Sequence, residues 1–193
     1  MVQYELMTPS LGGTSRHDGA SIVLAMNHYT PSTPVEILET EYPLLVRRFD
    51  LWRDSAGAGR YRGGAGYVRE YEFLDDCILT VRTSNHRYGP SGLLGGKGPR
   101  TSRTSVNPDG PDREELGILE TRQMTAGSVV RWEQSGGAGY GNPLERPVEE
   151  VLEDVENGYI SLESAAADYG VVIDPATRAI DWEATRARRS GPR

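Results

Sequence analysis

Two glycine-rich clusters limit what this chain of 193 residues can fold into. The first, "SAGAGRYRGGAGYVREYEF", spans Ser55 to Phe73 and runs into an apolar stretch, while the second, "GGAGYGNP", spans Gly136 to Pro143. Glycine permits positive φ angles and close approach between backbones, so such clusters favour hairpins and bulges. On this structural interpretation the backbone is shaped by Gly57, Gly59, Gly63, Gly64, Gly137, Gly139 and Gly141.

The side chains inside the clusters allow a second interpretation, in which the loops hold an anion. Arg60 and Arg62 would lie on the same side of an extended segment and could present two guanidiniums to a carboxylate or phosphate. Tyr140 is the one side chain of the second cluster that could line a pocket. The local pattern does not separate the two interpretations, so both stay open.

Neither cluster fits a nucleotide-binding loop. A P-loop requires glycine, four residues and then Gly-Lys-Ser/Thr, but Gly96-Lys97 is followed by Gly98 and preceded at the critical position by Ser91. The dinucleotide fingerprint Gly-x-Gly-x-x-Gly fails at its last position, which holds Arg62, Arg69 or Leu144 depending on the starting glycine. The sequence therefore predicts that this chain binds no nucleotide by itself.

The charge, the cysteine count and the lengths of the apolar runs limit which ligands and which cellular compartments suit this chain. The net charge of −7 argues against a nucleic acid or an anionic membrane as the main ligand. A single cysteine, Cys77, excludes an internal disulfide, and apolar runs of about five residues are far short of the roughly 20 that span a bilayer. The start of the chain lacks the basic tip and apolar stretch of a signal peptide, so we expect a soluble cytoplasmic protein.

The order of predicted elements gives an α+β fold. We expect strands over 45–51, 67–74 and 77–83 that form a meander, and two more over 116–123 and 128–134. Between them, residues 84–115 predict a long structureless loop that is functional or covered by another chain. A short strand is expected near 21–27.

Helical spacing begins at Pro147, where the pattern of the chain changes. Val148, Val151, Leu152 and Val155 follow the spacing of an amphipathic helix that Gly158 ends. Ser161 and Asp181 are expected to cap helices over 162–169 and 182–189, with a short hairpin between them. The expected fold is a mainly antiparallel β-sheet with glycine-rich loops over 1–146, followed by a small helical segment over 147–193.

No catalytic or metal centre stands out. The histidines are His17, His28 and His86, and neither their spacing nor the His17-Asp18 pair matches a metal motif. Cys77 begins an apolar strand and is expected to be a buried, unreactive thiol. There is no Gly-x-Ser-x-Gly elbow and no carboxylate dyad, so we assign neither metal ligands nor catalytic residues.

Longer blocks of the sequence resemble the C-terminal part of the hydantoinase B/oxoprolinase family. These blocks are "TPVEILETEYPLLVRRFDL", the first glycine cluster, "SGLLGGKG", "VNPDG" and the stretch from "SGGAGYGNPLERPVEEVLEDVENGY" to "VVID". The family includes the metal-binding subunits of ATP-dependent hydantoinases and 5-oxoprolinases and is related to acetone and acetophenone carboxylase subunits. Because family members are more than twice as long, we expect either a natural split subunit or a fragment.

The resemblance implies that this chain acts as one subunit of a multisubunit enzyme. A hydantoinase A-like partner would bind ATP and Mg²⁺ and phosphorylate the substrate, and the N-terminal hydantoinase B-like part, on another chain, would hold a divalent metal. The expected activity is cyclic-amide hydrolysis, with ketone carboxylation and a purely structural assembly role as alternatives. This chain alone would be inactive, with Arg60, Arg62 and Tyr140 as candidates for anion or interface contact.

Overall fold

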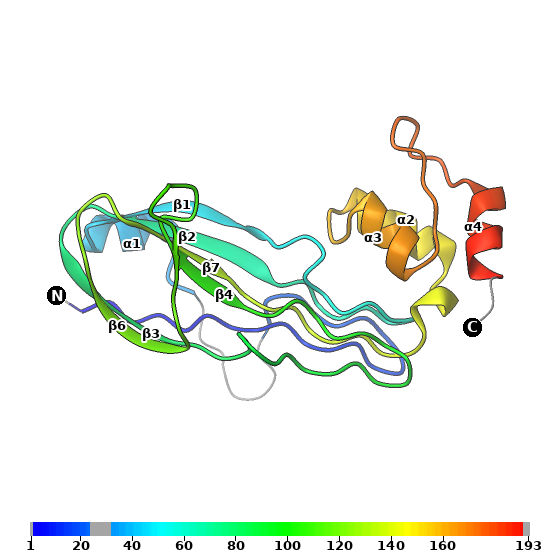
Figure 1. Ribbon diagram of the computed structural model, residues 1–193, viewed down its shortest axis with the longest axis horizontal. Helices are drawn as coiled ribbons and strands as arrows, with labels where there is room; N and C mark the ends of the chain where they lie inside the picture. Colours follow the sequence, from blue (N-terminus) through cyan, green and yellow to red (C-terminus); the bar gives the residue numbers. More distant parts are fainter. Residues whose placement is uncertain (1, 24–31, 191–193) are drawn as a thin grey trace.

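A computed structural model describes residues 2–23 and 32–190, and these form an elongated molecule with the sheets and one helix at one end and the other helices at the opposite end (Figure 1). The expected strand near 21–27 lies mostly outside the described residues. The strands are β1 (Leu44–Leu51), β2 (Tyr67–Phe73), β3 (Cys77–Arg82), β4 (Arg103–Val106), β5 (Glu114–Glu115), β6 (Leu119–Met124) and β7 (Val129–Glu133). The helices are α1 (Val35–Glu41), α2 (Val148–Glu156), α3 (Leu162–Asp168) and α4 (Trp182–Arg189), with a 3₁₀ turn, η1, over Pro143–Glu145.

The strands form two antiparallel sheets around one core. Five strands follow the order β1-β2-β7-β4-β5, while β3 and β6 form a separate two-stranded ribbon. Tyr71 of β2 and Trp132 of β7 meet edge to face with ring centroids 5.3 Å apart. Leu38 of α1 and Val81 and Met124 of the ribbon pack into the same core. The predicted α+β class, mainly antiparallel, is confirmed.

The predicted meander is wrong beyond its first pair. β1 and β2 are antiparallel neighbours, but β3 leaves β2 and pairs with β6, so that Cys77 faces Met124 and Arg82 faces Leu119. The reason is burial: five consecutive residues of β2 are buried, which requires a central position, whereas exposed and less exposed residues alternate along most of β3. The place beside β2 is therefore taken by β7 from distant sequence.

The segment 84–115 is not structureless. It contains β4, which adds to β7, and the two-residue β5. In β4 the buried residues Thr104 and Ser105 are polar, and this explains why hydrophobic periodicity does not reveal the strand. Helix α1 was also not predicted: it lies between Pro34 and Pro43, with Pro34 as its N-cap.

Between the sheet and the helices, the glycine clusters lie side by side in extended conformation with residues 10–20 and 92–98 (Figure 1). Backbone hydrogen bonds cross-link these segments outside any strand; the Gly57 N–H, for example, donates to the Gly137 carbonyl (2.8 Å). A Cβ on Gly137 would overlap the carbonyl of Leu11. Of the seven glycines singled out from the sequence, Gly141 has a positive φ (74°), whereas the others permit close backbone approach.

The helices at the other end begin and end close to the predicted positions. Pro147 is the N-cap of α2, the Ser161 hydroxyl accepts from the Ser164 N–H to cap α3, and Asp181 caps α4. The expected hairpin is reduced to a single bridge between Ile173 and Ile180. A second apolar core unites α2 and α3 with Ala58 of the first glycine cluster. Within the described ranges, no helix is long and apolar enough to cross a membrane.

Candidate functional site

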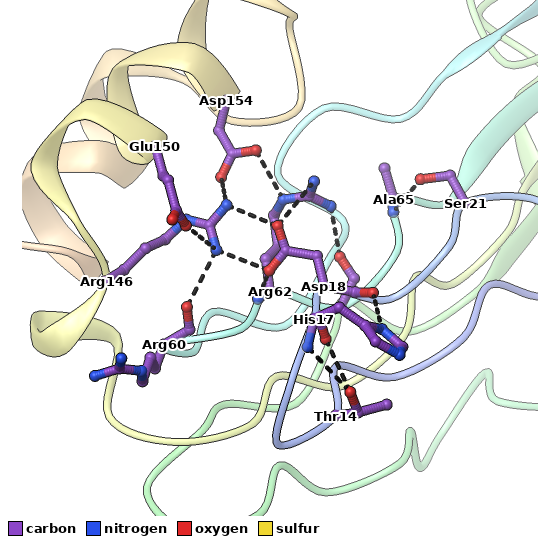
Figure 2. Close-up of polar contacts among 11 residues, drawn as sticks. Thr14, His17, Asp18, Ser21, Arg60, Arg62, Ala65, Arg146, Glu150 and Asp154 are labelled. Atoms are coloured by element: carbon purple, nitrogen blue, oxygen red, sulfur yellow. Dashed lines mark hydrogen bonds and ion pairs between the residues drawn. The ribbon is translucent and has the colours of Figure 1, made fainter.

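The two arginines of the first glycine cluster point into different surroundings (Figure 2). Arg60 is exposed, and its guanidinium lies 5.7 Å from the Tyr61 ring centroid. Arg62 is buried, with 5% of its surface exposed, and its guanidinium lies 4.2 Å from the Tyr159 ring centroid. The structure therefore does not bring Arg60 and Arg62 together as a pair of guanidiniums around one ligand.

Arg62 belongs to a group of charges that we call the Asp154 cluster, made of the half-buried Asp18 and the buried Arg62, Arg146 and Asp154 (Figure 2). Arg62 Nε lies 3.1 Å from Asp154 Oδ1, and Arg146 Nη2 lies 2.9 Å from Asp154 Oδ2. Arg146 also binds both oxygens of Asp18, each at 2.8 Å. These two arginines and two aspartates balance in formal charge.

The electrostatics of the cluster follow from burial and pairing. Burial raises the pKa of Asp154 above its ordinary value, and the Arg62 and Arg146 guanidiniums oppose that rise. Burial alone would lower the pKa of Arg146, but the hydrogen bond with Asp18 and the charge of Asp154 hold that pKa above its ordinary range. Both guanidiniums are thus engaged by carboxylates of the chain itself.

The ion pairs within the Asp154 cluster indicate a structural role for its charged side chains. It joins the N-terminal turn at Asp18, the first glycine cluster at Arg62 and helix α2 at Asp154, so it fixes the helical end onto the glycine segments. Anion binding by Arg60 and Arg62 stays a prediction, and Arg62 would have to release Asp154 to serve it. Sequence reasoning missed Arg146 and Asp154, although Asp154 lies on the apolar face of α2 beside Val151 and Val155, where a carboxylate requires a partner.

Tyr140, the third candidate, is held through its backbone. Its N–H and carbonyl pair with those of Tyr61 at 2.9 and 3.0 Å, and its side chain is half-buried. The neighbouring Gly139 accepts from the Leu93 N–H at 3.1 Å. Tyr140 therefore connects the second glycine cluster to the first and to residues 92–98.

The histidines and the cysteine lie apart. His17 Nδ1 contacts the Asp18 carbonyl at 3.0 Å, and the Asp18 carboxylate is engaged by Arg146. His86 Nε2 contacts Thr83 Oγ1 at 2.9 Å, and burial lowers the pKa of His86. Cys77 is half-buried, and burial raises its thiol pKa, as do Asp76 and Asp75. His28 lies outside the described residues. Within the described residues, no group of three His, Cys, Asp or Glu side chains is placed so that it could hold a metal ion.

A groove of about 1320 Å³ lies at the sheet end of the molecule, between the N-terminal segment Val2–Pro9, β3 and the five-stranded sheet. Leu79, Val81 and Trp132 supply apolar walls. Its polar groups include Glu5, which accepts a hydrogen bond from the Tyr71 hydroxyl and forms an ion pair with Arg69.

Within the groove, the charge of Glu5 is compensated by Arg69. Arg69, with 2% of its surface exposed, lies 4.9 Å from the Phe49 ring centroid and 5.1 Å from that of Tyr71. Burial, reinforced by the hydrogen bond to Glu5, raises the pKa of Tyr71 far above its ordinary value, so Tyr71 remains a donor. Gln3, Glu5 and Met7 are less exposed than their neighbours Val2, Tyr4 and Leu6, so the side of this segment that faces the protein carries two polar residues and is not the side that apolar alternation in the sequence would predict.

Three comparisons place the chain among known proteins. It is 39% identical over 166 residues to the caprolactamase subunit beta of Pseudomonas jessenii, covering 82% of this chain and 28% of that one. It is 26% identical to the acetophenone carboxylase delta subunit of Aromatoleum aromaticum, covering 98% of this chain and 33% of that one. The crystal structure of the ATP-dependent caprolactamase from Pseudomonas jessenii matches 96% of this chain and 33% of its own with a TM-score of 0.84 and 32% identity.

The chain thus spans about a third of the length of these relatives. Residues 1–143 match the family model described as hydantoinase B/oxoprolinase, which is well over half of the sequence. The sequence blocks, the fold and the family model agree. This chain belongs to the hydantoinase B/oxoprolinase family.

Proposed function

We propose that this chain acts in a multisubunit, ATP-dependent hydrolase of cyclic amides, of the hydantoinase and oxoprolinase type, and completes its hydantoinase B-like component. The observation that carries the proposal is the likeness to caprolactamase in both sequence and structure, at 39% identity and a TM-score of 0.84. The identity to the carboxylase subunit is lower, at 26%. The proposal extends to a cytoplasmic location.

The division of labour within this complex forms part of the proposal. A hydantoinase A-like subunit binds ATP and Mg²⁺, and the remaining hydantoinase B-like polypeptide holds a divalent metal. This chain supplies a rigid scaffold, which is supported by the mutual pairing of Arg62, Arg146, Asp18 and Asp154 and by the compensated carboxylate of Glu5. By itself it is inactive, and it meets substrate only through surfaces completed by its partners.

An activity assay on the intact complex tests this function. The complex is purified through a tag on this chain, supplied with ATP, Mg²⁺ and a panel of hydantoins and lactams, and followed for ADP release and ring opening. We expect ADP release that depends on the cyclic amide, together with the ring-opened product. The isolated chain is the control and is expected to release no ADP. Release of ADP without ring opening for every member of the panel would contradict the proposal.

A ketone carboxylase is the second candidate, favoured by a match to the acetophenone carboxylase subunit that covers 98% of this chain. The same complex, given acetone or acetophenone, would then release ADP only when bicarbonate is present. A purely structural role makes a different prediction. Replacing the exposed Arg60 and the half-buried Tyr140 would then leave both complex assembly and catalytic rate unchanged.

A further inference from the structure

The segment Val2–Pro9 has two contrasting sides. Toward the protein, Glu5 is held by Arg69 and Tyr71, and Met7 packs against the core. Away from the protein, Val2, Tyr4 and Leu6 expose 88%, 82% and 47% of their surface. The segment is therefore fixed in place by its inner side chains while its outer side chains are apolar and uncovered.

The backbone of this segment is uncovered as well. Residues 2–9 form no backbone–backbone hydrogen bond with the rest of the described chain, although they run in extended conformation along the groove (Figure 1). An extended segment with free N–H and carbonyl groups is a template for pairing with another strand. Proteins recognise extended peptides in this way: backbone hydrogen bonds provide affinity and alternate side chains provide specificity.

A further exposed apolar residue lies close to the segment. Ile78 of β3 exposes 70% of its surface and lines the same groove as Val2, Tyr4 and Leu6. We call these four residues the apolar strip. Trp182 on α4 is also exposed, but it lies on a helix, whose backbone groups are paired within the helix itself.

We infer that Val2–Pro9 and the apolar strip form the docking edge for an extended strand of the remaining hydantoinase B-like polypeptide. This inference rests on the proposed function, because it names the surface at which that component is completed. The match to caprolactamase covers 96% of this chain but 33% of the longer protein, and the part of that protein outside the match is the counterpart of the partner polypeptide in the proposed complex. The strip offers that polypeptide both backbone partners and apolar contact.

The geometry also defines the pattern that the incoming strand must have. Its backbone pairs with residues 2–8, because Pro9 has no N–H to donate and ends the edge. Since Val2, Tyr4 and Leu6 are spaced by two residues on the outer side, alternate residues of the incoming strand are expected to be apolar. A strand with charged residues at those positions would leave them desolvated against the strip.

Site-specific photo-crosslinking in the source cell tests the inference. A benzophenone amino acid replaces Tyr4, and in a matched control it replaces Trp182, which is half exposed on α4 at the opposite end of the molecule. We expect the probe at position 4 to capture peptides of hydantoinase B-type sequence from outside residues 1–193, and the probe at 182 to capture none of them. Capture of a second copy of this chain, capture of an unrelated protein or absence of capture at position 4 would overturn the inference.

Substitutions give an independent readout. Tyr4→Asp combined with Ile78→Asp is expected to reduce recovery of the hydantoinase B-like polypeptide with this chain at least about tenfold, the equivalent of 1.4 kcal/mol. Tyr4→Phe, and Trp182→Asp as the control, should preserve recovery. As a folding control, the double variant must have the same thermal unfolding temperature as the original chain. Unchanged recovery of the hydantoinase B-like polypeptide with a folded double variant would contradict the inference. If the double variant does not fold, the photo-crosslinking experiment alone tests the inference.

Failure of this inference can be distinguished from failure of the proposed function. If the complex hydrolyses cyclic amides with ATP but position 4 captures nothing, the docking edge is wrong and the function stands. If position 4 captures the hydantoinase B-like polypeptide but no cyclic amide stimulates ADP release, the docking edge stands and the function is wrong.

Discussion

The Asp154 cluster and the apolar strip differ in whether the chain itself supplies contacts for their side chains. In the cluster, the buried Arg62, Arg146 and Asp154 and the half-buried Asp18 come from distant parts of the chain and are paired with one another. In the strip, four apolar side chains and an extended backbone are left uncovered. In the first region the opposite charges are paired within the described chain, whereas we infer that the second region is covered by another polypeptide.

This difference indicates that, in a chain that spans about a third of its relatives' length, exposed apolar segments are better candidates for partner contact than charged residues that are already paired. Charged residues in a glycine-rich loop attract attention in the sequence, yet Arg62 is engaged by Asp154 and holds the helical end in place. The apolar N-terminal segment has no motif, yet it presents the unsatisfied surface. Variants that disturb the cluster should therefore affect folding, and variants in the strip should affect assembly.

The largest expected effect on folding comes from Arg146→Met. This change leaves Asp18 without its bidentate partner and leaves Asp154 with one guanidinium instead of two. Removing one member of a buried ion pair costs about 3 to 5 kcal/mol of unfolding free energy. Urea denaturation measures the loss, with Arg186→Met on the exposed face of α4 as a control expected to change stability by less than about 0.5 kcal/mol. Equal stability of both variants would show that the cluster does not hold the two ends together.

A somewhat smaller effect is expected from Gly137→Ala. The new methyl group would overlap the backbone of Leu11 and Gly12, which cannot move without separating the cross-linked segments. Overpacking of this kind typically costs about 1 to 3 kcal/mol. In Gly117→Ala the added Cβ meets only the Glu120 carboxylate, at an ordinary contact distance of 3.6 Å. Thermal melts in which Gly137→Ala is as stable as this control would contradict the close-packing account of the glycine clusters.

Tyr71→Phe tests the inner, satisfied side of the N-terminal segment. The change removes the hydroxyl that donates to Glu5 but keeps the ring that packs on Trp132. A hydrogen bond to a charged group contributes about 1.5 to 3 kcal/mol, and the retained ion pair with Arg69 places the expected loss at the lower end. The measurement is chemical denaturation, combined with proteolysis of residues 2–9, which should accelerate in the variant. Unchanged proteolysis would mean that Glu5 does not anchor the segment.

The smallest expected effect is the pH dependence that His86 contributes. Burial lowers the pKa of His86 in the folded chain, so below its ordinary value of 6.5 the unfolded chain binds more protons than the folded chain. Stability should therefore fall as pH drops from about 6.5 through the lowered pKa. Subtracting the profile of His86→Gln from that of the original chain isolates this component. A difference profile that rises as pH drops would contradict the burial of His86.

Local patterns in the sequence were sufficient for the helical end and insufficient for the sheet. Ser161 and Asp181 identified α3 and α4 because a cap and an apolar face are signals within a few residues. β4 was missed because its buried Thr104 and Ser105 carry no hydrophobic signal, and the meander failed because β2 pairs with β7, which lies about 60 residues further along the chain.

The candidate site shows the same limit. Arg62 could be singled out from the sequence, but its partners Asp18 and Asp154 lie 44 and 92 residues away, and their pairing depends on the fold. The family resemblance identified which proteins the chain is related to. It gave no indication of which surface is left uncovered, because that depends on how Val2–Pro9 lies against the sheet.

Hydrogen exchange of the backbone amides of residues 2–8 is the most direct test of the contrast between the paired cluster and the open strip. It is measured by mass spectrometry on the isolated chain and on the purified complex, with amides around Arg62 and Val155 as the internal reference. We predict that exchange in residues 2–8 slows at least about tenfold in the complex, while the reference amides are protected in both states. Equal exchange of residues 2–8 in the two states, with the complex intact, would contradict the account.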